Sequence, residues 1–287
     1  MLIQCILEKM RFPRSKDFFL IVPHIGIYII FFIIPIGLML IVSFYQNGTD
    51  SFTLENYITF LTKPIYQFVI LRTLGMAALV NIFCLALGYP LAYFITKSKY
   101  QGILTMMIMV PLLVSIMVRT FGWMVLLGRT GIINSTLMSL GIISDPIPLL
   151  YNMNGVILAM VHVLLPFMVL SLIAVLGNID KFTVEAAQNL GAGSIRRFMT
   201  IILPLSMPGI IAGSSLILSL AIAFFATPAL IGGASFKVLA TLIYSEIMDY
   251  FNWSLAAAMS VVSVIIVLVV IFSLSKIIQI KYKGVFK

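Results

Sequence analysis

The polar residues with the most regular spacing in this chain lie in one short segment, between Glu185 and Pro204. Glu185 is followed directly by two small residues, Ala186 and Ala187, and then by Gly191. On a short helix, small side chains beside an exposed carboxylate allow a partner surface to approach closely and to make polar contacts. The chemistry that this segment offers is docking rather than bond-making.

Arrangements typical of catalysis or of metal binding are missing from the sequence. His162 has no Cys, Asp or Glu at ligand spacing, so a hydrogen-bonded core histidine is favoured over a metal ligand or a proton relay. Cys5 and Cys84 also lack such spacing, and we expect two unreactive thiols without a disulfide. We therefore expect a chain that is not an enzyme and that binds no metal and no cofactor.

Two arginines fall within apolar stretches, where a charge is costly and points to function by default. Arg72 and Arg119 both lie close to the outer ends of these stretches, so their guanidinium groups could instead reach the headgroup region. Structural and functional roles remain open for both. In the functional alternative, Arg119 lines an outer vestibule or pairs with an acid such as Glu246 or Asp249.

The elements that must position these residues are membrane helices. Of the 287 residues, 62% are hydrophobic and only 9% are charged, and the mean hydropathy is +1.16. Roughly a quarter of the residues of a soluble domain are charged, so the solvent of this chain must be lipid. The apolar runs are continuous rather than alternating, which excludes a closed β-barrel.

A helix needs about 20 apolar residues to cross the hydrocarbon core. We predict an all-α protein with a single transmembrane domain over residues 1–287 and a tail of about residues 1–17. The six predicted spans are approximately 18–45, 67–95, 102–127, 152–177, 205–230 and 253–279. No carboxylate falls in the middle of a span, which disfavours a carrier driven by protons or sodium ions.

Basic residues gather on one side of these spans. They precede the first span, follow the second, lie between the fourth and fifth and end the chain, whereas the opposite loops carry more acidic than basic residues. By the positive-inside rule, both termini and the Glu185 segment are cytoplasmic. The net charge of +9 is therefore a topology signal and not a nucleic-acid footprint.

The Glu185 segment is expected to form two short helices. Asp180 is suited to cap a helix that runs through Leu190, and Gly191 supplies the break, because glycine takes positive φ without strain. A second helix starts at Ser194, and Pro204 opens the next span. The alternative is an ordinary solvated connection between two spans.

This spacing, Glu185-Ala186-Ala187, then Gly191, then Ile201-x-Leu203-Pro204, resembles the EAA loop of ABC-importer permeases at every motif position. The resemblance implies that the loop, about residues 178–204, docks on a cytoplasmic ATPase through a coupling helix of about residues 186–197. The implied coupling residues are Glu185, Ala186, Ala187, Gly191, Ala192, Arg196 and Arg197.

A second resemblance covers nearly the whole chain from about residue 18. The stretches Met109–Ser115, Val118–Trp123 and Leu127–Gly131 are similar to the first permease of spermidine/putrescine-type importers, as are Leu87–Tyr93 and Leu164–Met168. Related permeases carry opines, other cationic metabolites or ferric iron, so the resemblance specifies the subfamily better than the cargo. Candidate residues for the translocation path are Arg119, Trp123, His162, Asn81, Phe225, Glu246 and Asp249.

The resemblance also implies the context of the chain. It predicts a type I (MetI-like) permease of a bacterial cytoplasmic membrane, paired with a homologous second permease; a homodimer is the alternative. Two ATPase subunits would bind ATP and Mg, because this chain has no G-x-x-x-x-G-K-S/T phosphate loop. An extracytoplasmic solute-binding protein would deliver the cargo, and no nucleic acid is involved. A polytopic membrane enzyme or scaffold without a transport role is the alternative from another class.

Overall fold

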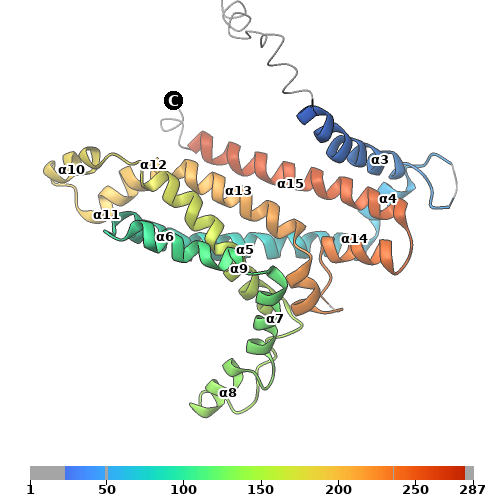
Figure 1. The fold of residues 1–287 in the computed structure, drawn as a ribbon, viewed down its shortest axis with the longest axis horizontal. Helices are drawn as coiled ribbons and strands as arrows, with labels where there is room; N and C mark the ends of the chain where they lie inside the picture. The colour runs from blue at the N-terminus through green and yellow to red at the C-terminus, as the bar shows by residue number, and fades with distance from the viewer. Residues whose placement is uncertain (1–22, 49–50, 235, 282–287) are drawn as a thin grey trace, which may run out of the picture.

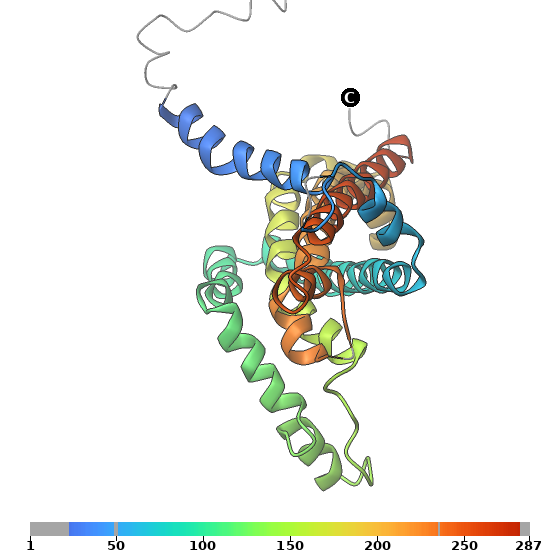
Figure 2. The ribbon, with the colours of Figure 1, turned by 90° about the vertical axis from the view of Figure 1, so that its right-hand side faces the viewer.

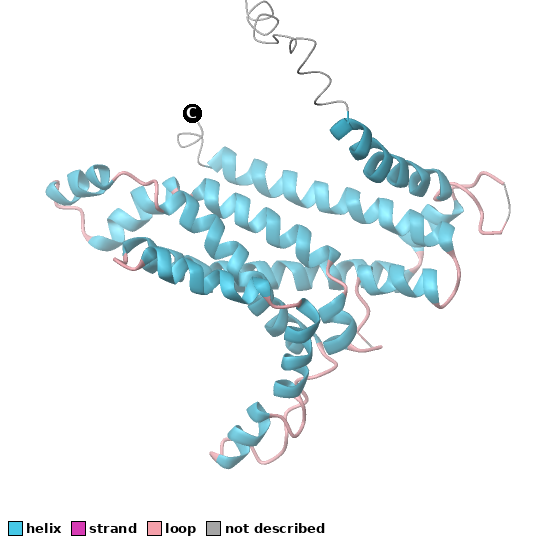
Figure 3. Ribbon diagram, in the orientation of Figure 1, coloured by secondary structure: helices cyan, strands magenta, loops and turns pink. Residues whose placement is uncertain are grey.

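The computed structural model describes residues 23–48, 51–234 and 236–281. Within these ranges the regular structure is helical, apart from an isolated β-bridge between Tyr45 and Phe52 (Figure 3). The prediction of an all-α fold is confirmed. The α-helices are α3 (Ile34–Val42), α4 (Glu55–Thr62), α5 (Pro64–Lys97), α6 (Gln101–Met109), α7 (Ile116–Leu127), α8 (Ile132–Ser139), α9 (Met153–Leu176), α10 (Lys181–Asn189), α11 (Ser194–Arg197), α12 (Leu203–Leu205), α13 (Met207–Ala223), α14 (Leu239–Met248) and α15 (Trp253–Lys281).

Five helical stretches are long and apolar enough to cross a membrane, and a bent pair of helices gives a sixth. The five are 23–42, 64–97, 116–139, 153–176 and 253–280. The bent pair joins Ser194–Leu205 to Met207–Ala223 at an angle of 60°. The upper count of six agrees with the number of spans expected from the sequence.

The third predicted span, 102–127, is not one helix. α6 ends at Met109, a 3₁₀ turn follows at Val110–Leu113, and Val114 and Ser115 are not helical before α7 begins. Pro111 in the first turn of the 3₁₀ segment has no N–H to continue the α-helical ladder. α7 then leaves the bundle in a new direction together with α8 (Figures 1 and 2). The span that begins with α7 instead continues to Ser139.

The fifth predicted span, 205–230, also has different limits. Pro204 does not open it, because it lies in α12, before the bend, and the long helix α13 begins at Met207 with Pro208 in its first turn. α13 ends at Ala223, and a π-helical turn follows at Pro228–Gly232. Hydropathy could not reveal these breaks, since the residues on both sides are equally apolar.

The core of the bundle is the packing of α5, α9 and α13. Glycines allow the close approach: a Cβ added at Gly88 of α5 would lie 3.0 Å from Met168 of α9, and one at Gly213 of α13 would lie 2.7 Å from the Met168 sulfur. Small residues serve this purpose in membrane helices, where van der Waals packing drives association. α15 packs against α13 and α14, whereas the stretch 23–42 has no fully buried residue.

The two ends of the bundle carry different elements (Figure 1). α10, α11, the start of α6 and the end of α15 lie at one end, and α4 and α14 lie toward the other. Three of the segments that the charge pattern assigns to the cytoplasm therefore lie at the same end, and the tail of about residues 1–17 lies outside the described residues. Which end faces the cytoplasm stays a prediction.

Candidate functional site

The loop that contains Glu185 forms the predicted helix. Asp180 is its N-cap: its carboxylate accepts the backbone N–H of Phe182 at 3.0 Å and the hydroxyl of Thr183 at 3.3 Å. Such a cap satisfies an otherwise unpaired donor of the first turn. α10 ends at Asn189, with Leu190 as its C-cap, as the sequence predicted.

Gly191 makes the turn after α10 with a φ of +81°. The backbone N–H of Gly191 donates to Gln188 O at 2.9 Å, and that of Ala192 donates to Ala187 O at 3.0 Å. A side chain at Gly191 would meet nothing within 4 Å, so the backbone angle and not the available space favours glycine here. The predicted role of Gly191 in the turn is confirmed.

Arg197 holds α10 and α11 together. Its guanidinium donates to the Gln188 side chain, and its Nη2 donates to Ser194 Oγ at 3.2 Å. Arg197 is half-buried, whereas Arg196 is exposed. Of the two predicted coupling arginines, Arg196 is the one with a side chain open to a partner, and Arg197 makes the loop a compact unit.

The exposed face of the loop is more apolar than the sequence motif indicated. Glu185 and Ala186 are exposed, as expected for docking residues. Phe182, Leu190 and Ile195 are 79%, 88% and 79% exposed, and we call these three the loop apolar surface. The sequence signal was available, because large apolar side chains in a charged loop between two spans need a partner to cover them.

Two of the predicted path residues lie together between α7 and α9. The indole Nε1 of Trp123 donates to Nδ1 of His162 at 3.1 Å, and the two rings meet edge-on at 5.5 Å. His162 is hydrogen-bonded as predicted, but its side chain is exposed, so its predicted place in the core is wrong. The sequence of α9 is apolar on nearly every side, so it could not show which face of this helix its neighbours leave open.

Arg119 lies on α7, one residue before Thr120, whose hydroxyl meets that of Thr227 at 3.2 Å. Nε and Nη1 of Arg119 are buried and have no hydrogen-bond partner among the described residues. Among the residues that the structure describes, Arg119 also forms no ion pair with Glu246 or Asp249, which both belong to the α14 region. The suggested outer pairing is therefore not observed.

The remaining path candidates are scattered. Asn81 lies on α5 with a buried side-chain oxygen that has no partner among the described residues. Phe225 follows α13, and its ring lies 4.8 Å from that of Tyr244. Asp249 is exposed at the end of α14. The structure thus brings together Trp123 and His162 but does not join the whole predicted set.

Arg72 has a structural environment. Its guanidinium lies over the rings of Phe68 and Phe236, at 4.4 and 5.0 Å from their centroids, and Nη1 donates to Lys237 O at 3.4 Å. Cation–π contacts of this kind stabilise a partly desolvated arginine. Of the two roles left open for Arg72, the structural one is favoured.

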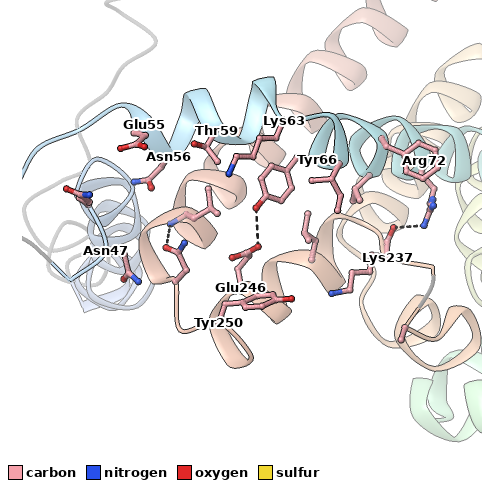
Figure 4. A pocket seen from close by; sticks show the side chains of 18 residues that line it. Asn47, Glu55, Asn56, Thr59, Lys63, Tyr66, Arg72, Lys237, Glu246 and Tyr250 are labelled. Carbon is pink, nitrogen blue, oxygen red and sulfur yellow. Dashed lines mark hydrogen bonds between the residues drawn. The ribbon is translucent and has the colours of Figure 1, made fainter.

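Glu246 lines a cavity of about 870 Å³ at the α4 and α14 end of the bundle (Figure 4). Glu246 is only 6% exposed, and its carboxylate accepts a hydrogen bond from the Tyr66 hydroxyl at 3.4 Å. Burial raises the pKa of Glu246, while the Tyr66 hydrogen bond and the positive charges of Lys237 and Lys63 oppose this increase. Glu246 is therefore a buried acid with cationic neighbours.

Within the described residues, no group of three or more His, Cys, Asp or Glu side chains is arranged to hold a metal ion. Cys84 is buried and is not in a disulfide. Cys5 lies outside the described residues.

Comparison with known proteins identifies the family. The chain is 38% identical over 251 residues to the spermidine/putrescine transport system permease protein PotB of Haemophilus influenzae, across 85% of this chain and 87% of that protein. It is 35% identical over 255 residues to PotB of Escherichia coli strain K12, across 86% and 92%. The chain belongs to the PotB family of ABC-importer permeases. No family model matches the sequence.

Solved structures share the fold of this PotB-family permease. A chain of the bacterial alginate ABC transporter, in complex with an alginate pentasaccharide-bound periplasmic protein, has a TM-score of 0.78 at 18% identity, across 93% of this chain and 95% of that chain. A chain of the MetNI methionine ABC transporter, in an inward-facing conformation, has a TM-score of 0.57 at 17% identity, across 76% and 98%. The predicted MetI-like permease fold is confirmed.

Proposed function

We propose that this permease subunit forms half of the path through which an ATP-driven importer moves a polyamine such as spermidine or putrescine. The observation that supports this choice of cargo is the similarity to two proteins named as spermidine/putrescine permeases. In each comparison the similarity extends over most of this chain and most of the relative. The acidic excess of the predicted outer loops would mildly favour cations near the mouth. Selection of the cargo would reside mainly in a separate solute-binding protein.

The loop of α10 and α11 is the proposed contact with the ATPase. Its exposed carboxylate, Glu185, and the loop apolar surface suit a groove on a soluble subunit. ATP and Mg would bind to that subunit. When the ATPase subunits close, the loop would move with them and would transmit this movement to α13 through the bend at 205–207. The compact cap, turn and arginine contacts make the loop suitable as a rigid lever.

The proposed working unit contains two permeases, two ATPases and a binding protein on the outer side of a bacterial cytoplasmic membrane. The stretch 23–42 has no fully buried residue, so much of its apolar surface is open to lipid or to a second permease. We propose a homologous but different chain as this second permease. The mass of the purified complex tests the composition: a single permease that transports on its own contradicts it.

Uptake of radiolabelled spermidine tests the cargo. The full complex is expressed in a strain without other polyamine importers, and a variant that cannot hydrolyse ATP is the control. We expect uptake that depends on ATP and on the binding protein. Clear uptake of an opine, of ferric iron or of another solute, without uptake of spermidine or putrescine, would refute the polyamine assignment and leave the permease assignment intact.

A further inference from the structure

The cavity around Glu246 has a mixed charge that the transport function does not explain. It lies between α4, the start of α5, α14 and the start of α15, and its volume is about 870 Å³. Figure 4 shows Lys63, Tyr66 and Glu246 pointing toward one another within it. Its charged lining residues are Glu55, Lys63, Arg72, Lys237 and Glu246.

These charges argue against several ligands. A polyamine would meet the side chains of Lys63, Arg72 and Lys237, which repel it. A simple anion would meet the carboxylates of Glu55 and Glu246. A ligand with both a negative and a positive group can pair with the basic and with the acidic side chains of the cavity. Such attraction between opposite charges is strongest where water is partly excluded.

Glu246 is the group that a positive ligand would reach. Only 6% of the surface of Glu246 is exposed, and the single hydrogen bond of its carboxylate among the described residues is the long one from the Tyr66 hydroxyl, at 3.4 Å. A carboxylate has two oxygens and about four acceptor sites. Most of the acceptor capacity of this buried acid is therefore unused, although burial makes its charge costly.

The cavity lies beside the ends of two candidate membrane spans, where a membrane interface is expected. α5 and α15 are spans that begin beside it, at Pro64 and Trp253. Exposed aromatic side chains lie close together at the start of α15, where Tyr250, Phe251 and Trp253 are 65%, 68% and 57% exposed. Such side chains mark the level of the lipid headgroups in membrane proteins.

The lining of the cavity contains both polar and apolar side chains. Beside the charged groups it includes Ile65, Phe68, Val69, Leu242 and Leu255. A free polar solute gains nothing from these side chains, whereas a lipid can place the first part of its acyl chains against them. The combination suits an amphiphile.

We propose that this cavity binds the headgroup of a phosphatidylethanolamine-type lipid. Lys63 and Lys237 contact the phosphate, and Glu246 accepts hydrogen bonds from the ammonium group. A primary ammonium has N–H donors for the carboxylate, and the trimethylammonium of phosphatidylcholine has none. An anionic lipid without an amine would leave the Glu246 carboxylate with only the long hydrogen bond from Tyr66. This inference does not depend on the identity of the cargo.

Native mass spectrometry of the delipidated complex tests the proposal. The complex is titrated with phosphatidylethanolamine and with phosphatidylcholine of the same chain length. We expect the ethanolamine lipid to bind on the order of tenfold more tightly, as for one added charge-assisted hydrogen bond. Glu246→Gln should remove this preference, because the amide is neutral and of similar size. Lys63→Gln combined with Lys237→Gln should weaken both lipids, since they share the phosphate.

Matched controls lie nearby. Asp249→Asn changes an exposed acid of the α14 region, and Arg129→Gln changes an exposed base that is predicted to lie on the same side of the membrane, and neither residue lines the cavity. Both should keep the preference for the ethanolamine lipid. Lys63→Gln provides a second test if Glu246→Gln fails to fold, because Lys63 is exposed and its substitution leaves the core intact.

Equal binding of the two lipids to the wild-type complex would overturn the proposal, as would a preference that survives Glu246→Gln. Free O-phosphoethanolamine is the third ligand in the titration. It should compete only at much higher concentration than the lipid, because it cannot use the apolar lining. Competition at the same concentration would make the cavity a site for a soluble zwitterion and would refute the lipid assignment.

Discussion

Gly191 sets the direction of the chain between the two helices of the coupling loop through one backbone angle, a φ of +81°. Left-handed backbone costs an L-residue about 1–2 kcal/mol, and a β-branched residue more. Gly191→Val is therefore expected to misplace α11 against α10 while membrane levels of the protein stay normal. ATP hydrolysis stimulated by the loaded binding protein should fall strongly in proteoliposomes, and Gly191→Ala should lose less.

The neighbouring glycine provides the control. Gly193 has a φ of −64°, and nothing lies within 4 Å of its missing side chain. Gly193→Ala should therefore keep near wild-type stimulation. Full stimulation in Gly191→Val would show that the turn geometry does not matter for coupling.

Glu246 gives a second prediction at the residue scale, on stability. Because burial raises the pKa of Glu246, the folded protein holds this proton more tightly than the unfolded chain does. At a pH above the folded pKa the carboxylate is ionised in the folded protein, and its buried charge lowers the free energy of unfolding. Below the unfolded pKa the group is protonated in both states, so this destabilisation disappears. In delipidated complex, Glu246→Gln should raise the melting temperature at pH 8 and not at pH 4. Asp249→Asn, at an exposed position, should change neither value.

At the scale of the elements, α10 and α11 present the loop apolar surface beyond the bundle. Phe182, Leu190 and Ile195 expose large side chains that the free energy of folding alone does not explain. If this surface docks on the ATPase, a charge introduced there must lose its water without gaining an opposite charge, which costs several kcal/mol. Leu190→Asp should therefore release the ATPase from the complex during purification.

The control for this prediction changes an exposed apolar residue at the opposite end of the bundle. Phe52 is 70% exposed and precedes α4, far along the chain from the loop. Phe52→Asp should leave the ATPase bound. Retention of the ATPase by Leu190→Asp and Ile195→Asp would place the contact elsewhere on the permease.

At the scale of the whole molecule, the arrangement of charges and spans predicts the orientation. Cysteines introduced at Asp145 and Asp249 should react with an impermeant maleimide added from outside intact cells. A cysteine at Ala192 should react only after the cells are opened. The labelling is done in a Cys5→Ser background, and the other native cysteine, Cys84, is buried and should not interfere. Labelling of the Ala192 position from outside would reverse the topology and would remove the basis for docking on an ATPase.

The sequence by itself determined the class of this protein. Its apolar composition requires lipid as the solvent, and the runs of about 20 apolar residues require helices, since backbone groups in hydrocarbon must be paired within the segment. Local rules also sufficed for α10 and its turn, because Asp180 caps within three residues and Gly191 needs no distant contact. The motif around Glu185 was therefore predictable in both position and shape.

Only the tertiary structure decided where the apolar spans break and which polar groups meet. α6 and α7 are separated at Val114 and Ser115, inside a run with no change of hydropathy. The pairs Trp123–His162 and Tyr66–Glu246 join residues that are far apart in the chain. In a membrane protein, lipid and protein interior are equally apolar, so periodicity does not mark the buried face of a helix. Packing alone selects that face, and with it the side chains that line a cavity.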